Sequence, residues 1–297
     1  MMSTGVSARG AWEAVAYPPA PAVRSYVRRM MGYGERSPVA VRRHELPSGT
    51  VPLIIGIDAG IDVHAPGRDD RPPRRLTSFA AGLHETGALT VHDGVWSGVQ
   101  VDLTPLGARR LLGVPMHEVL NRDVPLRDAL GREGDTLEER VNDAADWVSR
   151  IATVEDFLIR RFARSAPPRW EVQWAWGALD ARDGRVPISE LMRETGWSAR
   201  HLAVRFRDEV GVVPKLYAQM LRFRHAVTLL DAGDPADLAR VAAATGYADQ
   251  SHLSREVRRF SGLSPMRLRA RRLAEGSAAI AGGTEVTFLH DDTPPAG

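Results

Sequence analysis

The chain has 297 residues, a length that favours two domains, and its shares of 43% hydrophobic and 26% charged residues are typical of a globular protein. No apolar run approaches the roughly 18 residues that cross a membrane, and the N-terminus lacks a secretory signal pattern, so we expect a cytoplasmic protein without membrane contact. The lack of cysteine excludes disulfides and a thiol nucleophile.

The net charge of +2 is unevenly distributed. Residues 170–272 carry 17 basic and 12 acidic side chains, so the rest of the chain is slightly acidic. The C-terminal region is therefore the part suited to bind phosphates, although a solvated charged surface would explain the same excess.

The region from Val51 to Leu103 is predicted to be rich in short strands. Gly- and Pro-containing turns separate five segments: VPLIIGI, IDVH, TSFAAG, ALTVH and GVQVDL. Asp93-Gly94, between the last two, predicts a β-hairpin because this pair suits the tight turn between twisted strands. We expect a small barrel or sandwich.

Helices are predicted from Thr104-Pro105 onward, since a capping hydroxyl followed by proline is a good helix start. Apolar residues recur at helical spacing over Leu106–Leu112, Pro125–Leu130 and about Leu137–Arg164. The proline-rich stretch at residues 165–168 then indicates a boundary. We predict a β-rich sensor or dimerisation domain over residues 1–165, a DNA-binding domain over 166–274, and a flexible tail without regular structure over 275–297.

Two segments about fifty residues apart are variations on one pattern, which is the strongest signal in the sequence. Residues 194–214 are ETGWSARHLAVRFRDEVGVVP, and residues 244–265 are ATGYADQSHLSREVRRFSGLSP. Thr195-Gly196-Trp197 matches Thr245-Gly246-Tyr247 at an offset of 50, and His201-Leu202 matches His252-Leu253 at 51. The turn of the second copy is therefore one residue longer.

Each copy has the features of a helix-turn-helix unit: a short amphipathic helix, a glycine that ends it, an aromatic residue at the corner and a second helix. The first helices are expected over Ile188–Thr195 and Asp237–Thr245. In the second helices, apolar residues four apart share the buried face and leave another face free. The free faces carry our candidate DNA contacts: Arg200, His201, Val204 and Arg207 in the first copy, and Gln250, Ser251, Arg255, Arg258 and Arg259 in the second. An isolated surface arginine is more often merely solvated, but the duplicated context favours DNA binding.

The segment Pro214–Asp231 between the copies is predicted to be one helix of 18 residues, about 27 Å long. Its length would let two recognition helices enter consecutive major grooves, about 34 Å apart. Arg222 and Arg224 on this helix either contact phosphates or are simply solvated.

Over roughly Trp170 to Arg272 the sequence resembles the AraC/XylS family of bacterial transcriptional regulators. The resemblance depends on the two units, their spacing, and the pattern Gly246-Tyr247, Leu253, Arg255, Gly262 and Ser264-Pro265. It implies seven helices in this region and an α+β multidomain protein with a β-rich sensor domain ahead of an all-α domain. It also implies base contacts from the second helix of each unit, at Arg200 and at Gln250, Ser251 and Arg255. Two residues depart from the family pattern: Val204 stands where a polar or basic residue is common, and Val257 where phenylalanine is usual.

The resemblance implies double-stranded promoter DNA as a partner and a small-molecule effector of unknown identity. RNA polymerase and a second copy of the chain are further candidate partners, and the sign of regulation, activation or repression, stays open. We expect no cofactor and no enzyme activity. The segment LTPLGARRLLGVPMHE, starting at Leu103, resembles one that precedes such DNA-binding domains in related regulators.

Two alternatives stay open at this point. His44-Glu45, His64, His84-Glu85 and His92-Asp93 lie among the predicted strands, so a cupin-type metal-dependent enzyme or sensor could be fused to the DNA-binding region, although no compact ligand spacing supports a metal site. A purely architectural DNA binder is the other alternative.

Overall fold

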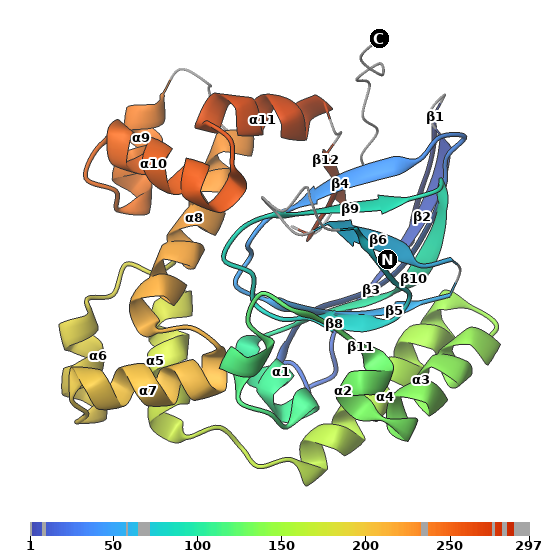
Figure 1. Cartoon of the computed structure of the whole chain (residues 1–297), viewed down its shortest axis with the longest axis horizontal. Helices are drawn as coiled ribbons and strands as arrows, with labels where there is room; N and C mark the ends of the chain where they lie inside the picture. The colour runs from blue at the N-terminus through green and yellow to red at the C-terminus, as the bar shows by residue number, and fades with distance from the viewer. Residues whose placement is uncertain are drawn as a thin grey trace.

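The computed structural model describes residues 2–7, 10–57, 59–64, 72–232, 237–274, 277–280 and 284–287. Figure 1 shows two parts: a layered β-rich part formed by the N-terminal half, and a helical part to its left formed by the C-terminal third. This arrangement confirms the predicted α+β architecture.

The β-rich part is built from two antiparallel sheets. Seven strands form the larger sheet, in the order β1 (Met2–Ser7), β2 (Gly10–Tyr17), β3 (Val27–Arg36), β10 (Val95–Leu103), β5 (Val51–Gly56), β8 (Phe79–Ala81) and β11 (Asp123–Pro125). Four strands form the smaller one, in the order β4 (Val41–Glu45), β9 (Ala88–His92), β6 (Ile61–His64) and β7 (Arg74–Leu76). The first strands of the chain were not predicted, because their sequences mix glycine, arginine and alanine with few β-branched residues.

The sheets face each other across a small apolar core, in which Tyr33, Trp96 and Phe79 are buried. Helices cover the other face of the larger sheet: α1 (Pro105–Leu112), α2 (Leu126–Leu130), α3 (Arg132–Asp143) and α4 (Trp147–Arg164), with a short 3-10 helix, η1, at Met116–Val119. Val99 and Val101 of β10 pack with α4 residues such as Leu158 in the main core. The N-terminal part therefore has three layers.

The hairpin predicted at Asp93-Gly94 is wrong. Strand β9 pairs with β4 and β6, whereas β10 pairs with β3 and β5, so the Asp93-Gly94 pair is a corner between the two sheets. Gly94 has a φ of +95°, and a Cβ there would lie 2.3 Å from the Ser37 carbonyl oxygen. A glycine is therefore needed here, because the corner between β9 and β10 lies close to the connection between β3 and β4, and not because a two-residue hairpin turn forms.

The long helix predicted to end at Arg164 is two helices, α3 and α4. The chain is extended at Ala144, and the Asp146 side chain accepts a hydrogen bond from Ser149 N at 2.8 Å, which caps α4. Helix α1 begins as predicted, with Thr104 Oγ1 accepting from Gly107 N at 3.0 Å. The periodicity continued across the break because both helices bury apolar faces against the same sheet.

The C-terminal third is helical. It contains α5 (Trp170–Ala181), α6 (Ile188–Thr195), α7 (Ala199–Val210), α8 (Pro214–Ala232), α9 (Leu238–Thr245), α10 (Gln250–Ser261) and α11 (Pro265–Ala274). These are the seven helices that the resemblance implies. In the segment predicted to lack regular structure, β12 (Ser277–Ile280) pairs with β13 (Thr284–Thr287), so that prediction is wrong for these two segments; residues 275–276, 281–283 and 288–297 lie outside the described residues.

The two parts are in contact along α5, α7, α8 and α10. The Tyr217 hydroxyl of α8 donates to the Gly49 carbonyl at 3.2 Å, and Gly87 N donates to the Phe260 carbonyl of α10 at 2.9 Å. Arg28 of β3 forms an ion pair with Asp180 of α5. The helical part is therefore attached to the sheets at several separate points. No helix within the described ranges is long and apolar enough to cross a membrane.

Candidate nucleic-acid interface and adjoining cavity

Helices α6 and α7 form the first helix-turn-helix unit. Gly196, with a φ of 70°, ends α6, and the Ser198 side chain accepts from His201 N at 3.3 Å to cap α7. Thr195 is buried and its hydroxyl donates to the Leu191 carbonyl at 2.7 Å, so this threonine supports the end of α6.

Helices α9 and α10 repeat these contacts in the second unit. Thr245 Oγ1 donates to the Val241 carbonyl at 2.6 Å, Gly246 has a φ of 76°, and Asp249 accepts from His252 N at 2.7 Å. The sequence repeat is thus a structural repeat, including the hydrogen bonds that fix each turn.

A histidine packs edge-on against the corner aromatic residue in both units, a feature that the sequence analysis missed. The ring centroids of Trp197 and His201 are 4.6 Å apart with an interplanar angle of 81°, and those of Tyr247 and His252 are 5.2 Å apart at 78°. The histidine recurs at the same place in both copies of the sequence repeat, 51 residues apart, and this recurrence could have indicated its structural role. His201, predicted as a DNA contact, therefore also holds the turn of its own unit.

The predicted contact residues lie on exposed faces of α7 and α10. Arg200, Val204 and Arg207 follow one another at spacings of four and three residues, so they share one face of α7. Ser251, Arg255 and Arg258 have the same spacing on α10. All six are exposed, including Val204 at 50%. An apolar side chain at the centre of one face therefore corresponds to an arginine at the centre of the other.

Gln250 is also exposed, at the first turn of α10, whereas Arg259 is partly engaged by the protein. Arg259 Nη1 donates to Gln219 Oε1 of α8 at 3.3 Å and lies 3.7 Å from Glu256 Oε1. A DNA contact by Arg259 would have to compete with these two partners.

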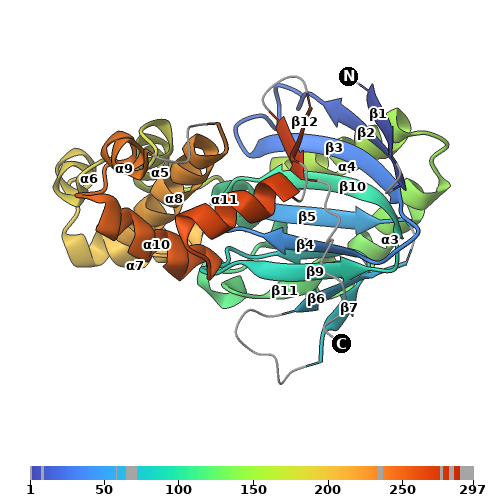
Figure 2. The same ribbon diagram turned by 90° about the horizontal axis from the view of Figure 1, so that it is seen from above.

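Helix α8 has 19 residues, so it is about 28 Å long, one residue longer than predicted. Figures 1 and 2 show α7 and α10 near opposite ends of α8 and on the same side of it. Arg222 and Arg224 do not project freely from α8, because Arg222 donates to the Gly184 carbonyl at 3.1 Å and Arg224 lies 3.5 Å from Asp183. They connect α8 to the turn before α6 instead.

Arg222 and Arg185 also tie the second unit to the first. The Arg222 guanidinium lies 5.8 Å from the centre of the Tyr247 ring, and Arg185 donates to the Ala244 carbonyl at 3.3 Å. Burial and nearby Glu256 raise the pKa of Tyr247 to about 12, so the corner of the second unit stays uncharged. These contacts restrict the relative placement of the two units.

The four histidine positions considered as metal ligands are dispersed. His92 Nε2 lies 2.6 Å from Glu35 Oε1, and His84 Nε2 lies 3.2 Å from Asp123 Oδ1. His44 is near Arg271, and His64 is at the end of β6. Within the part of the chain that the structure describes, no three His, Asp or Glu side chains come close enough together to hold a metal ion.

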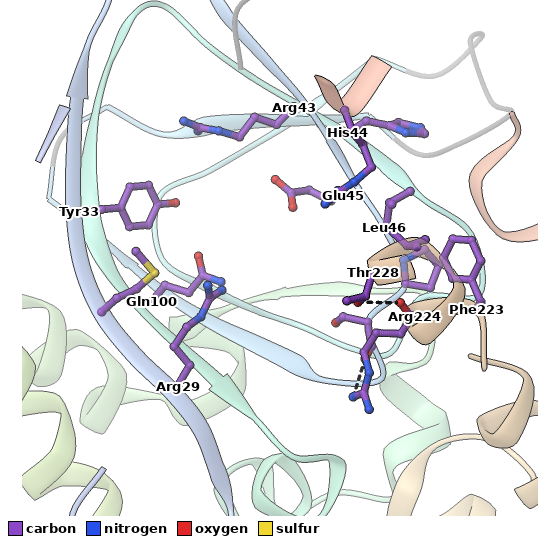
Figure 3. Close-up of a pocket in the computed structure, with 15 residues that line it drawn as sticks. Arg29, Tyr33, Arg43, His44, Glu45, Leu46, Gln100, Phe223, Arg224 and Thr228 are labelled. Carbon is purple, nitrogen blue, oxygen red and sulfur yellow. Dashed lines mark hydrogen bonds between the residues drawn. The ribbon is translucent and has the colours of Figure 1, made fainter. Parts of the chain in front are cut away.

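A cavity of about 220 Å³ lies between the sheets and α8. Figure 3 shows Tyr33, Gln100 and Arg29 reaching into it from the larger sheet and Glu45 from β4, while Leu46, Phe223 and Thr228 close the opposite side. An adjoining cavity of about 240 Å³ extends between the sheets toward Phe79 and Leu83. His44, Glu45 and Arg224 were named from the sequence for other roles, and the cavity itself was not predicted.

Behind this cavity, a buried charge cluster joins the two sheets. Glu35 of β3 contacts both Arg43 of β4 and His92 of β9, and all three side chains are at most 10% exposed. Burial alone would raise the pKa of Glu35, but the Arg43 and His92 side chains together hold it below its ordinary value. Burial likewise raises the pKa of Tyr33, so its hydroxyl remains protonated.

Comparisons with known proteins also find a helix-turn-helix domain in the helical part of the chain. A family model described as a helix-turn-helix domain matches residues 191–271. An uncharacterized HTH-type transcriptional regulator, YbfI, from Bacillus subtilis (strain 168) is 38% identical over 69 residues, which is 23% of this chain and 24% of that protein. The matched segment thus spans about a quarter of that relative's length.

One solved structure is similar to most of the chain, and another is similar to about a third of it. ToxT from Vibrio cholerae is 11% identical, with a TM-score of 0.45, over 81% of this chain and 97% of that one. A probable AraC family transcriptional regulator from Rhodopseudomonas palustris CGA009 is 27% identical over 34% of this chain and 95% of that one, with a TM-score of 0.31. From its internal repeat, its turn geometry and the matching family model, the C-terminal region of this chain belongs to the AraC/XylS type of helix-turn-helix domain.

Proposed function

We propose that this protein is a sequence-specific transcription regulator that binds promoter DNA through both helix-turn-helix units. The observation that carries the proposal is the structural repeat: α7 and α10 lie near opposite ends of α8, and each has exposed candidate contacts at the same spacing. Arginine guanidinium groups on these faces can bind phosphates and the acceptor groups of guanine.

The length of α8 supports insertion into consecutive major grooves. At about 28 Å it is comparable to the 34 Å or so between successive grooves on one face of a duplex. One chain then contacts two half-sites, as helix-turn-helix dimers do.

The cavity between the sheets and α8 is the proposed site of a small-molecule effector. Phe223, Arg224 and Val227 of α8 form part of its wall, so an occupant would contact the helix that joins the two units. RNA polymerase and a second copy of this chain stay predicted partners, and the domain limits 1–165, 166–274 and 275–297 stay predictions as well.

Selection of binding sites from random duplexes with the full-length protein tests the proposal. We expect one enriched site with two half-sites about one helical turn apart, bound at least ~10³-fold more tightly than scrambled DNA. Affinity should fall steeply with salt, because arginine contacts to phosphates release counterions. Arg160→Ala, which removes an exposed arginine of α4, is the matched control and should leave affinity unchanged.

An architectural DNA binder would give a different result. It would bind scrambled and selected duplexes almost equally, and no sequence would be enriched. That outcome, with the protein folded, would refute the proposal.

A further inference from the structure

A cleft of about 630 Å³ lies where the connection from α4 to α5 passes α1 and the end of α7 (Figure 1). It shares no lining residue with the two cavities described above. Glu209 of α7 is the one carboxylate among the described residues that line it, whereas five arginines do: Arg109, Arg110, Arg161, Arg164 and Arg169. These arginines lie outside residues 170–272, in the part of the chain where acidic side chains outnumber basic ones, so their grouping does not follow from the general charge of the chain.

Two of the five arginines, Arg110 and Arg161, have structural partners that account for their positions. Arg161 Nε donates to the Leu111 carbonyl at 2.9 Å. Arg110 donates to the Phe162 carbonyl, and its Nε donates to Ser165 Oγ at 2.9 Å. Each arginine thereby satisfies a carbonyl in the last turn of the other's helix, where backbone carbonyls have no partner within the helix. No ligand is needed to explain these two.

The other three guanidinium groups have weak partners or none. The Arg164 side chain is 75% exposed, and its Nη1 lies 4.0 Å from Glu133 Oε1. The Arg169 side chain is 55% exposed, and its Nε lies 3.7 Å from Glu209 Oε1. Arg109 is partly buried in the last turn of α1, and its guanidinium forms no hydrogen bond or ion pair with any residue that the structure describes. Because exposed ion pairs contribute little to stability, an anionic ligand loses little by competing with these carboxylates.

Glu209 shows that the cleft can hold a negative charge. Its side chain is 12% exposed, and its Oε2 accepts a hydrogen bond from Arg169 N at 3.1 Å. Burial raises the pKa of Glu209, and the Arg169 and Arg109 side chains oppose that rise, so both arginines are close enough to act on the same carboxylate. Arg109 belongs to the N-terminal part, and Arg169 lies directly before α5 of the helical part. One carboxylate between them does not balance the guanidinium groups that line the cleft.

The cleft lies on the side of α7 away from its candidate DNA contacts. Arg207 and Glu209 are two residues apart, and a helix turns by about 100° per residue, so their side chains project in nearly opposite directions. A duplex on the face formed by Arg200, Val204 and Arg207 is therefore on the other side of α7 from the cleft. The occupant that fits this position is a small molecule.

We infer that the cleft binds a phosphorylated small molecule, whose phosphate groups lie between Arg109, Arg164 and Arg169. A phosphate monoester carries about 1.5 to 2 negative charges at neutral pH and has three acceptor oxygens, so it can bind more than one guanidinium group, whereas a monocarboxylate brings a single charge. The planar guanidinium group also matches the spacing of phosphate oxygens. This site goes beyond the proposed function, because it is separate from the effector cavity beside α8 and does not depend on DNA binding.

Titration calorimetry tests the inference with the full-length protein and three probes, inorganic phosphate, pyrophosphate and acetate, at one ionic strength set with sodium chloride. We expect pyrophosphate to bind most tightly, phosphate more weakly and acetate not measurably. Arg109→Gln and Arg169→Gln should each weaken pyrophosphate binding about tenfold, because each removes one charge-assisted contact. Arg109→Lys keeps the charge without the planar group and should fall between Arg109→Gln and the parent. Arg42→Gln removes an exposed arginine of β4 outside the cleft, and this matched control should bind like the parent.

The inference is overturned if neither phosphate probe binds at millimolar concentration, if acetate binds as tightly as pyrophosphate, or if Arg42→Gln loses as much affinity as Arg109→Gln. Circular dichroism checks that each variant is folded, and Arg164→Gln replaces any variant that is not.

Fluorescence anisotropy with the selected duplex, in buffer without phosphate, tests the DNA backbone as the source of the phosphate groups. Arg109→Gln should bind the duplex like the parent. A loss of duplex affinity as large as the loss for pyrophosphate would assign the cleft to DNA and overturn the inference. A protein that binds pyrophosphate through these arginines but no specific duplex refutes only the proposed function.

Discussion

At the residue scale, the two recognition helices differ most at one pair of equivalent positions. Val204 and Arg255 are both exposed, and the repeat superposes them at an offset of 51. An arginine can donate two hydrogen bonds to the major-groove acceptors of guanine, whereas valine offers an apolar contact such as one with a thymine methyl group. The two half-sites should therefore be unequal.

We expect Arg255→Ala to cost about 1–3 kcal/mol of DNA-binding free energy and to relax the preference at one base pair. Val204→Ala should cost less and weaken a preference roughly one helical turn away, and Arg200→Ala shows whether that residue contacts a base or a phosphate. Site selection with each variant measures these effects. An unchanged base preference for Arg255→Ala would remove this residue from the list of base contacts.

Another residue-scale prediction concerns Glu35, which holds Arg43 and His92 together between the sheets. Glu35→Gln leaves a buried guanidinium without its counter-charge, so the free energy of unfolding should fall by about 3 kcal/mol. Denaturant titration followed by circular dichroism measures the loss, with Glu118→Gln, at an exposed carboxylate of η1, as the control. A loss below about 1 kcal/mol would mean that the cluster contributes little to stability.

The same carboxyl group gives stability a pH dependence with a defined sign. Because the pKa of Glu35 is lower in the folded protein than its ordinary value of 4.5, its contribution is present above that pH and is lost as the pH falls through the folded value. Acid titration should therefore destabilise the parent protein more steeply below pH 4.5 than it destabilises Glu35→Gln.

At the element scale, the caps of the recognition helices decide how firmly each exposed face is held. Asp249 accepts a shorter hydrogen bond at the start of α10 than Ser198 does at the start of α7, 2.7 Å against 3.3 Å. Asp249→Ala should lower the unfolding free energy by about 1 kcal/mol, whereas Asp249→Asn keeps an acceptor and should lose much less. Thermal melts compare them; equal losses would show that charge rather than capping matters.

The helical elements were largely predictable, because each begins and ends on local signals. The first helix of each unit ends at a glycine, Gly196 or Gly246, and the second begins at a capping residue, Ser198 or Asp249. Because the pattern occurs twice, each prediction could be compared with its counterpart in the other unit. The sheet was less predictable. Pairing of β9 with β4, rather than with β10, depends on residues some fifty positions apart, and no local pattern around Gly94 distinguishes a corner from a hairpin.

The cavity was not predicted either, although the alternation along β10 contained a hint. Val99 and Val101 face the helices, so Gln100 and Asp102 between them face the other sheet, where a polar residue is unusual unless it lines a cavity. Recognising this requires knowing that a second sheet covers that face. The candidate DNA contacts needed no such knowledge, since the exposed face of each recognition helix follows from its own apolar spacing.

At the scale of the whole molecule, the helical part should function without the sheets. We expect a fragment of residues 165–274 to fold and to bind the selected duplex, because both units and α8 lie within it. It would expose Leu221 and Tyr217, which now contact the loop at Gly49, so it should be less stable than the full chain. Fluorescence anisotropy on the purified fragment tests this; a folded fragment without specific binding would contradict the predicted boundary.

Phe223 and Val227 line the cavity from α8, the helix that also separates the two recognition helices. Any occupant that favours one placement of α8 changes the affinity for DNA, and thermodynamic reciprocity requires DNA to change the affinity for that occupant by the same factor. Titrating ligand in the presence and absence of the selected duplex measures the coupling free energy. A factor of one would make the two sites independent, whereas any other value makes the promoter itself an allosteric effector of the cavity.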